Sequence, residues 1–197
     1  MRAAAFIGIG LQEDHIGERP ALPLEGAGKV RDAARRLVSH ARGKGLPLLV
    51  TADTHADDDV IFESFPHHCV PGTSGHALWS ELELGEPTRV RSEDPAPSLD
   101  GATAVVIESS DHRRGLFQNL HADTVVAQLD AELYVVFGGP VEADLRGAVM
   151  GLLARGKKVA VVSDALAFLD GERASSHLAA MSASGAGFLT TDGALKL

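Results

Sequence analysis

The sequence predicts an α/β protein in which helices cover both faces of a parallel β-sheet. Short apolar runs alternate with amphipathic segments along most of the chain, and this alternation of strand and helix is typical of a parallel sheet with crossover helices. The chain has 197 residues, of which 45% are hydrophobic. We therefore expect a single domain over residues 1–197 with a sizeable core.

The expected elements follow one another in a regular order. Each strand is a short apolar run: 4–10, 47–53, 103–109, 133–139, 158–165 and 187–191. Helices are expected where apolar residues recur at helical spacing: 29–45, 122–131, 141–156 and 173–185. The polar segment between the second and third strands should be mostly loop, interrupted by a short helix near 76–82.

Composition limits the partners of this chain. The formal net charge is −9 at pH 7, which argues against nucleic acid and anionic membranes because both require clustered cations. No window of the sequence reaches the ~18 apolar residues of a membrane span. The single cysteine, Cys69, rules out an internal disulfide and fits a reducing cytoplasm. A small-molecule ligand or substrate is the partner that we expect.

Polar residues follow the carboxyl ends of the expected strands, where open parallel sheets bind their ligands. Asp53 and His55 stand two residues apart after the second strand, so in an extended segment both side chains project to the same side. His68 comes a short loop later. One carboxylate and two imidazoles suit Zn²⁺, Mn²⁺ or Fe²⁺. The alternative is a solvated acidic loop with surface histidines.

Two glycine-containing turns are further candidates for ligand binding. The stretch GIGLQE lacks the third glycine of a dinucleotide fingerprint, so an oxidoreductase would depend on Gly8 and Gly10 alone, and a bend near a ligand is favoured. Gln12 follows this bend. Gly139 and Pro140 join a strand to a helix, whose first N–H groups offer a place for an anion or a developing oxyanion.

Several motifs together resemble the isochorismatase-like, or cysteine hydrolase, superfamily. VTADTH followed by FPHHCVPGTSGHAL is similar to the D-x-H and W-P-x-H-C-V-x-G-T-x-G segments of nicotinamidases, and LYVVFGG, LLARGKKVAVVSDAL and HLAAMSASGAGFLTTDGAL resemble later parts of the same superfamily. The resemblance implies a six-stranded, mostly parallel sheet in a Rossmann-type three-layer sandwich. It also implies hydrolysis of a small amide, a divalent ion held by Asp53, His55 and His68, and a homo-oligomer.

The Asp-Lys-Cys triad of that superfamily does not carry over to this sequence. By the resemblance, Gly10 stands at the Asp position, Arg91 or Glu108 at the Lys position, and Asp144 at the position of the nucleophilic Cys. The sequence has no lysine between positions 44 and 157, so the Lys position is changed under either alignment. We therefore take Asp144, Arg91 and Glu108 as the candidate catalytic residues. For Asp144, which lies in the first turn of its helix, the alternative is a surface acid that complements the helix dipole.

Two functions remain open from the sequence. The first is a divergent hydrolase that uses a metal ion and carboxylates to activate water for attack on a small amide. The second is a catalytically inactive family member that binds a ligand or acts as a scaffold. Cys69 could be a nucleophile, a metal ligand or a packed apolar residue. The resemblance places it beside His68 and away from the nucleophile position, which favours packing.

Overall fold

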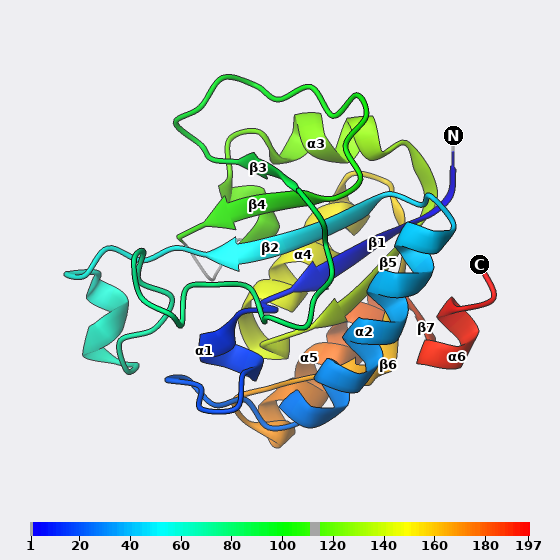
Figure 1. Cartoon of the computed structure of the whole chain (residues 1–197). Helices are drawn as coiled ribbons and strands as arrows, with labels where there is room; N and C mark the ends of the chain where they lie inside the picture. The colour runs from blue at the N-terminus through cyan, green and yellow to red at the C-terminus, as the bar shows by residue number, and fades with distance from the viewer. Residues whose placement is uncertain (1, 111–114) are drawn as a thin grey trace.

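A computed structural model describes residues 2–110 and 115–197 and confirms the α/β class (Figure 1). Within these ranges, seven strands form one parallel sheet in the order β3-β4-β2-β1-β5-β6-β7. The strands are β1 (Arg2–Ile9), β2 (Leu48–Asp53), β3 (Thr88–Val90), β4 (Val105–Ser109), β5 (Ala131–Gly138), β6 (Lys158–Leu166) and β7 (Gly187–Leu189). All six expected strands are present, and β3 adds a short edge strand.

Helices lie on both faces of the sheet, as the alternating sequence predicts. One face packs against α2 (Ala27–Gly43), α1 (Glu13–Ile16) and α6 (Thr191–Ala194). The other face packs against α3 (Ala122–Leu129), α4 (Arg146–Ala154) and α5 (Gly171–Ala183). In β1, Ala4 and Phe6 belong to the first core and Ala5 and Ile7 to the second, because successive strand residues point to opposite faces.

The longest helix shows how the sequence pattern places an element. The six buried positions of α2 recur three and four residues apart: Val30, Ala33, Ala34, Leu37, Val38 and Ala41. This spacing puts them on one face, which packs on the sheet. The helix begins after Gly26, whose φ of 87° lies in the left-handed region that glycine adopts without steric cost.

Three local expectations need correction. The helix expected near 76–82 is absent from this described segment, because Leu78 pairs with Gln12 in an isolated antiparallel bridge and the residues around it form turns. The helix expected over 141–156 begins instead as a π-helical turn, Val141–Leu145, and continues as α4. The polar segment contains the 3₁₀ helix η1, Val60–Glu63.

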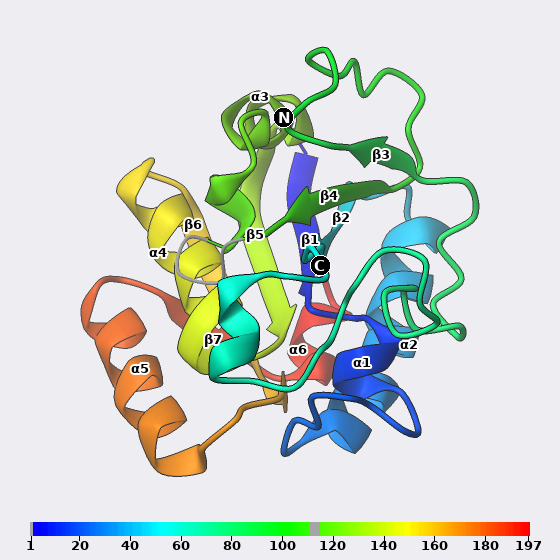
Figure 2. The same cartoon turned by 90° about the vertical axis from the view of Figure 1, so that its left-hand side faces the viewer.

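The carboxyl ends of the central strands meet at one edge of the sheet, and Figure 2 looks onto this edge. The short helices α1 and η1 lie in front of it, each on a segment that leaves a central strand. This edge therefore brings together residues that are far apart in the sequence. Among the described residues, no helix is both long and apolar enough to cross a membrane.

Candidate functional site

Asp53 is fixed at the end of β2 by the buried side chain of Gln12. The Gln12 Oε1 accepts the Asp53 N–H at 2.6 Å, and the Gln12 Nε2 donates to the carbonyl oxygens of Asp53 and His76, both at 2.9 Å. Gln12 is 0% exposed and Asp53 is 2% exposed. Gln12, a candidate ligand-binding residue, thus uses its side-chain amide to fix the backbone of Asp53.

The two predicted histidine ligands are buried and oriented by oxygen acceptors. The Nδ1 of His55 lies 2.9 Å from Asp59 Oδ2, and the Nδ1 of His68 lies 2.7 Å from the Pro66 carbonyl oxygen. Because these oxygens accept hydrogen bonds, each Nδ1 carries the proton, and in a neutral ring the lone pair is on Nε2. This carboxylate or carbonyl support is the usual arrangement behind a metal-binding imidazole, so both residues fit a divalent cation.

The low exposure of the two histidines decides between a metal site and a solvated surface loop. His55 and His68 are each 1% exposed, whereas the neighbouring His67 side chain is 61% exposed and the Asp57 side chain is 90% exposed. The alternative of surface histidines therefore describes His67 and does not describe the two predicted ligands.

His15 belongs to the same cluster, although sequence analysis did not identify it. The four-residue helix α1 follows the first strand and carries His15 to the carboxyl edge of β2. The His15 Nε2 lies 3.6 Å from Asp53 Oδ2 and 3.8 Å from Cys69 Sγ. The position of His15 just after a buried strand was the available signal, but nothing in the local spacing connects it to the other two residues.

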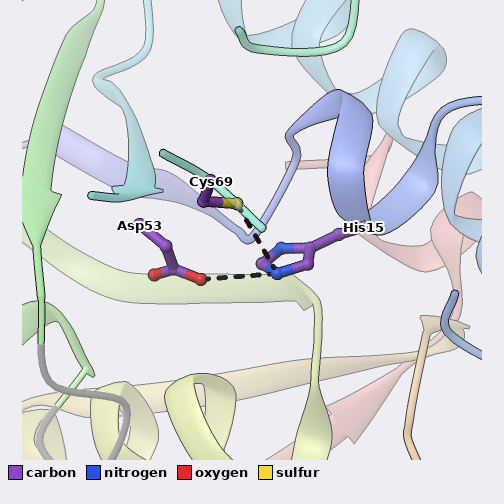
Figure 3. A group of neighbouring side chains, drawn as sticks. All are labelled: His15, Asp53 and Cys69. Atoms are coloured by element: carbon purple, nitrogen blue, oxygen red, sulfur yellow. Dashed lines mark hydrogen bonds and ion pairs between the residues drawn. The ribbon is translucent and has the colours of Figure 1, made fainter. Parts of the chain in front are cut away.

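Three of these side chains form a compact group of possible metal ligands. Among the described residues, the donors of His15, Asp53 and Cys69 all lie within 4.8 Å of one another (Figure 3). The ring centroids of His68 and His15 are 5.7 Å apart, and those of His68 and His55 are 5.0 Å apart. The predicted ligands His55 and His68 are therefore adjacent to each other, whereas the group of ligand atoms that contains Asp53 is completed by His15 and Cys69.

Cys69 lies in the interior of this group. It is 0% exposed, and its N–H donates to Asp14 Oδ2 at 2.7 Å. Burial raises the pKa of the Cys69 thiol well above its usual range, and the negative charges of Asp53, Asp14 and Asp144 raise it further. In the absence of a metal ion, the sulfur is thus held as a neutral thiol.

Asp144 lies beside the turn that joins β5 to the following helix. The Gly139–Pro140 peptide bond is cis, and the Val141 N–H donates to the Ala167 carbonyl oxygen at 3.0 Å. Asp144 is 1% exposed in the π-helical turn. This burial excludes the alternative of a solvated surface acid.

Arg91 and Glu108, the two candidates for one catalytic position, contact each other. The Arg91 Nε donates to Glu108 Oε2 at 3.2 Å, and the Arg89 Nη1 lies 3.6 Å from Glu108 Oε1. The Glu108 side chain is 11% exposed, while both arginine side chains are about half exposed, at 48% and 49%. The two candidates thus form an ion pair at the ends of β3 and β4.

A cavity of about 700 Å³ lies next to the histidines. His68, Pro140 and Ala143 line it together with side chains from η1. Its wall is mostly apolar, from Leu22, Val60, Ile61, Phe65 and Leu169, with Asp59, Glu63, Ser64 and Ser110 as polar members. A cavity of this size and character suits a small organic ligand.

Gly10 occupies a position at which no other residue fits well. Its φ is 60°, and a Cβ placed there would lie 2.1 Å from the Gly139 carbonyl oxygen and 3.1 Å from His15 Nδ1. The close approach of the two backbones, β1 to the turn after β5, requires a glycine at this point.

The fold is similar to that of solved structures of isochorismatase-like hydrolases and amidases. The matching solved structures include an isochorismatase-like hydrolase from Alkaliphilus metalliredigens, with a TM-score of 0.79 and 21% identity over 98% of both chains. The pyrazinamidase of Pyrococcus horikoshii in complex with zinc matches with a TM-score of 0.79 and 20% identity over 95% of this chain and 98% of that one. The N-carbamoylsarcosine amidase from Thermoplasma acidophilum matches with a TM-score of 0.73 and 22% identity over 96% and 97%.

The sequence alone gives no such match. No protein-family model matches the chain, and no curated protein matches it. At identities of 20–22%, the structural neighbours establish the fold that the resemblance implied. Function therefore has to be argued from the residues of the site.

Proposed function

We propose that this protein holds a divalent cation, Zn²⁺, Mn²⁺ or Fe²⁺, through Asp53, His55 and His68 and hydrolyses a small amide or related carbonyl compound without a cysteine nucleophile. The orientation of the two histidines carries this proposal. Each imidazole has an oxygen acceptor at Nδ1, which fixes the tautomer that a metal ligand needs. The adjacent cavity, lined by His68, supplies room for a substrate.

The state of Cys69 supports a reaction that does not use a thiolate. A nucleophilic cysteine requires a lowered pKa, which a cation or a helix N-terminus provides. The Cys69 thiol has instead a raised pKa, because it is buried and the nearby charges that act on it are carboxylates. By the resemblance, the position of the nucleophile is occupied by Asp144.

Asp144 supplies a general base in this proposal. Pro140 and Ala143, on either side of the same turn, line the cavity, and Asp144 is buried next to them. The carboxylate accepts a proton from water as the water oxygen forms a bond with the carbonyl carbon. The C–N bond then breaks, and the proton passes to the leaving amine. A bound divalent cation would supply Lewis-acid polarisation of the substrate carbonyl.

A ligand-binding protein without turnover is the second candidate, and one observation favours it. The positions that the resemblance assigns to the triad hold a glycine without space for a side chain, Gly10, and an ion pair between Arg91 and Glu108. Gly10 supplies no acid, and the charge of Arg91 is already paired with Glu108, so the pattern that would activate a nucleophile is missing at these positions. In this case the cavity and the cation site would serve binding alone.

Metal content and turnover distinguish the two functions. The purified, untagged protein would be stripped with a chelator, reloaded with Zn²⁺, Mn²⁺ or Fe²⁺, and assayed on a panel of small amides and esters. We expect about one bound Mn²⁺ or Fe²⁺ per chain in the set of Asp53, His55 and His68, lost in H55A and H68A. Asp144→Asn should lower kcat by about 10²–10⁴-fold, the usual contribution of a general base.

His67→Ala is a matched control for the histidine variants. His67 is adjacent in sequence to His68 but has a side chain that is 61% exposed, so its loss should leave metal content and turnover unchanged. A wild-type protein that binds metal but hydrolyses no compound in the panel would exclude the hydrolase and leave the ligand-binding function. Full activity in Asp144→Asn would exclude Asp144 as the base.

A further inference from the structure

His15, Asp53 and Cys69 come from three different segments and place their ligand atoms around one point. His15 is on α1, Asp53 ends β2, and Cys69 follows η1. The three residues are 0%, 2% and 0% exposed. In Figure 3, the carboxylate of Asp53 and the sulfur of Cys69 both face the same nitrogen of His15, its Nε2.

This convergence on a single nitrogen differs from a catalytic Cys-His-Asp relay. In a relay, the imidazole uses one nitrogen for the nucleophile and the other for the carboxylate, so a proton can cross the ring. In this protein, Asp53 and Cys69 share Nε2, at 3.6 Å and 3.8 Å, while the Nδ1 of His15 is directed towards Gly10. Three different donor atoms that lie within 4.8 Å of one another are close enough together to bind one ion.

The distances between the donors fit a tetrahedral ion of the size of Zn²⁺. With ordinary bond lengths to nitrogen, oxygen and sulfur, a tetrahedral site separates N from O by about 3.3 Å and N from S by about 3.6 Å. The corresponding distances here are 3.6 Å and 3.8 Å. These two pairs need to approach by about 0.2–0.3 Å to reach the bonded geometry, and the third pair, Asp53 and Cys69, lies within 4.8 Å.

We infer that His15, Asp53 and Cys69 form a sulfur-containing cation site that selects a thiophilic ion, such as Zn²⁺, Co²⁺ or Cd²⁺, over Mg²⁺ or Ca²⁺. We call the set of His15, Asp53 and Cys69 the inner site. It shares Asp53 with the set of Asp53, His55 and His68 but does not depend on the proposed hydrolysis. Binding converts the Cys69 thiol into a metal-bound thiolate and releases its proton to solvent. Thiolate and imidazole ligands are the ones that such soft and borderline ions prefer.

The charge around the sulfur supports a cation at this place. The charged groups that act on the Cys69 thiol are three carboxylates, those of Asp53, Asp14 and Asp144. Their negative charge works against an isolated thiolate but favours a divalent cation, which offsets both the carboxylates and the sulfur. The ring of His68 is a neighbour of this group, 5.7 Å from the ring of His15 by centroid.

Cobalt provides a direct probe of the sulfur. The untagged, reduced and chelator-stripped protein would be titrated with Co²⁺ while the near-ultraviolet thiolate-to-cobalt charge-transfer absorption is recorded. We expect this absorption to saturate at about one ion per chain, with release of about one proton from the thiol. Cys69→Ser should abolish the absorption, and His15→Gln should lower the affinity by at least about 10-fold.

Two further variants separate the inner site from the proposed one. His55→Ala removes a ligand of the other set alone and should keep the charge-transfer absorption. His67→Ala, at an exposed ring, should change nothing. Far-ultraviolet circular dichroism would confirm that each variant is folded, and proton release by the wild type would test the site if Cys69→Ser does not fold.

The outcomes distinguish the two proposals. Cobalt binding without a sulfur band, lost in His55→Ala and kept in Cys69→Ser, would overturn the inner site and support the set of Asp53, His55 and His68. A sulfur band that survives in His55→Ala supports the inner site whether or not the protein hydrolyses an amide. A wild-type protein that binds neither Co²⁺ nor Zn²⁺ would contradict both sites.

Discussion

Replacing Gly10 by alanine tests whether the backbone itself excludes a side chain at the position where the resemblance expects a catalytic acid. The added Cβ would lie 2.1 Å from the Gly139 carbonyl oxygen, and the φ of 60° is in the left-handed region. Left-handed backbone costs a non-glycine residue about 1–2 kcal/mol, and overpacking costs about 1–3 kcal/mol more. We therefore expect Gly10→Ala to lose about 2–5 kcal/mol of the free energy of unfolding.

Urea unfolding followed by far-ultraviolet circular dichroism measures this loss. With an m-value of about 2 kcal/mol per molar urea, the midpoint should fall by at least about 1 M. The matched control is Gly28→Ala on α2, where the nearest atom to an added Cβ is Arg31 Nη2 at 3.9 Å. Alanine is the better helix former, so this control should gain up to about 1 kcal/mol. A midpoint for Gly10→Ala as high as that of Gly28→Ala would refute the steric reasoning.

Three other predictions concern residues that surround the site. Gln12→Ala removes the hydrogen-bond partner of buried backbone groups of Asp53 and His76, so the free energy of unfolding in urea should fall by about 2–4 kcal/mol. The metal affinity, measured by competition with a chelating dye, should fall about 10–100-fold. Cys69 is fully buried, so in metal-free native protein it should react with a thiol reagent far more slowly than in urea; equal rates would show that the site is open. Burial lowers the pKa of His76 below its usual 6.5, although the charge of Glu108 acts in the opposite direction. The unfolded chain therefore binds a proton at His76 more readily than the folded protein does, so the stability that is present above pH 6.5 is lost as the pH falls. The urea midpoint of His76→Gln should therefore decrease less than that of the wild type between pH 7 and pH 5, and parallel curves would contradict the assignment.

The sequence was sufficient for the fold because a doubly covered parallel sheet has a strong local signature. A central strand such as β2 is a continuous run of buried residues, and the buried residues of α2 recur at helical spacing. The same logic placed Asp53 and His55 at the carboxyl edge, because strand ends are recognisable from where an apolar run stops.

The sequence was insufficient where contacts join distant segments without a local pattern. His15 and Cys69 are 54 positions apart, and neither has a spacing that predicts the other. The isolated bridge between Gln12 and Leu78 replaces the helix expected near 76–82, because pairing with a distant segment decides the backbone there. The left-handed backbone at Gly10 is also set by the neighbouring turn after β5, which no local motif reveals.

The two ligand sets make the identity of the ion informative about the chemistry of the site. The set of Asp53, His55 and His68 offers nitrogen and oxygen, which Zn²⁺, Mn²⁺ and Fe²⁺ all accept. The set that contains Cys69 offers sulfur, which favours Zn²⁺ over Mn²⁺. Because both sets include Asp53, an ion in one of them changes the charge available to the other. A protein that retains zinc through Cys69 would therefore engage Asp53 with His15 and Cys69, whereas one that retains manganese would leave Cys69 as a buried thiol and engage Asp53 with His55 and His68.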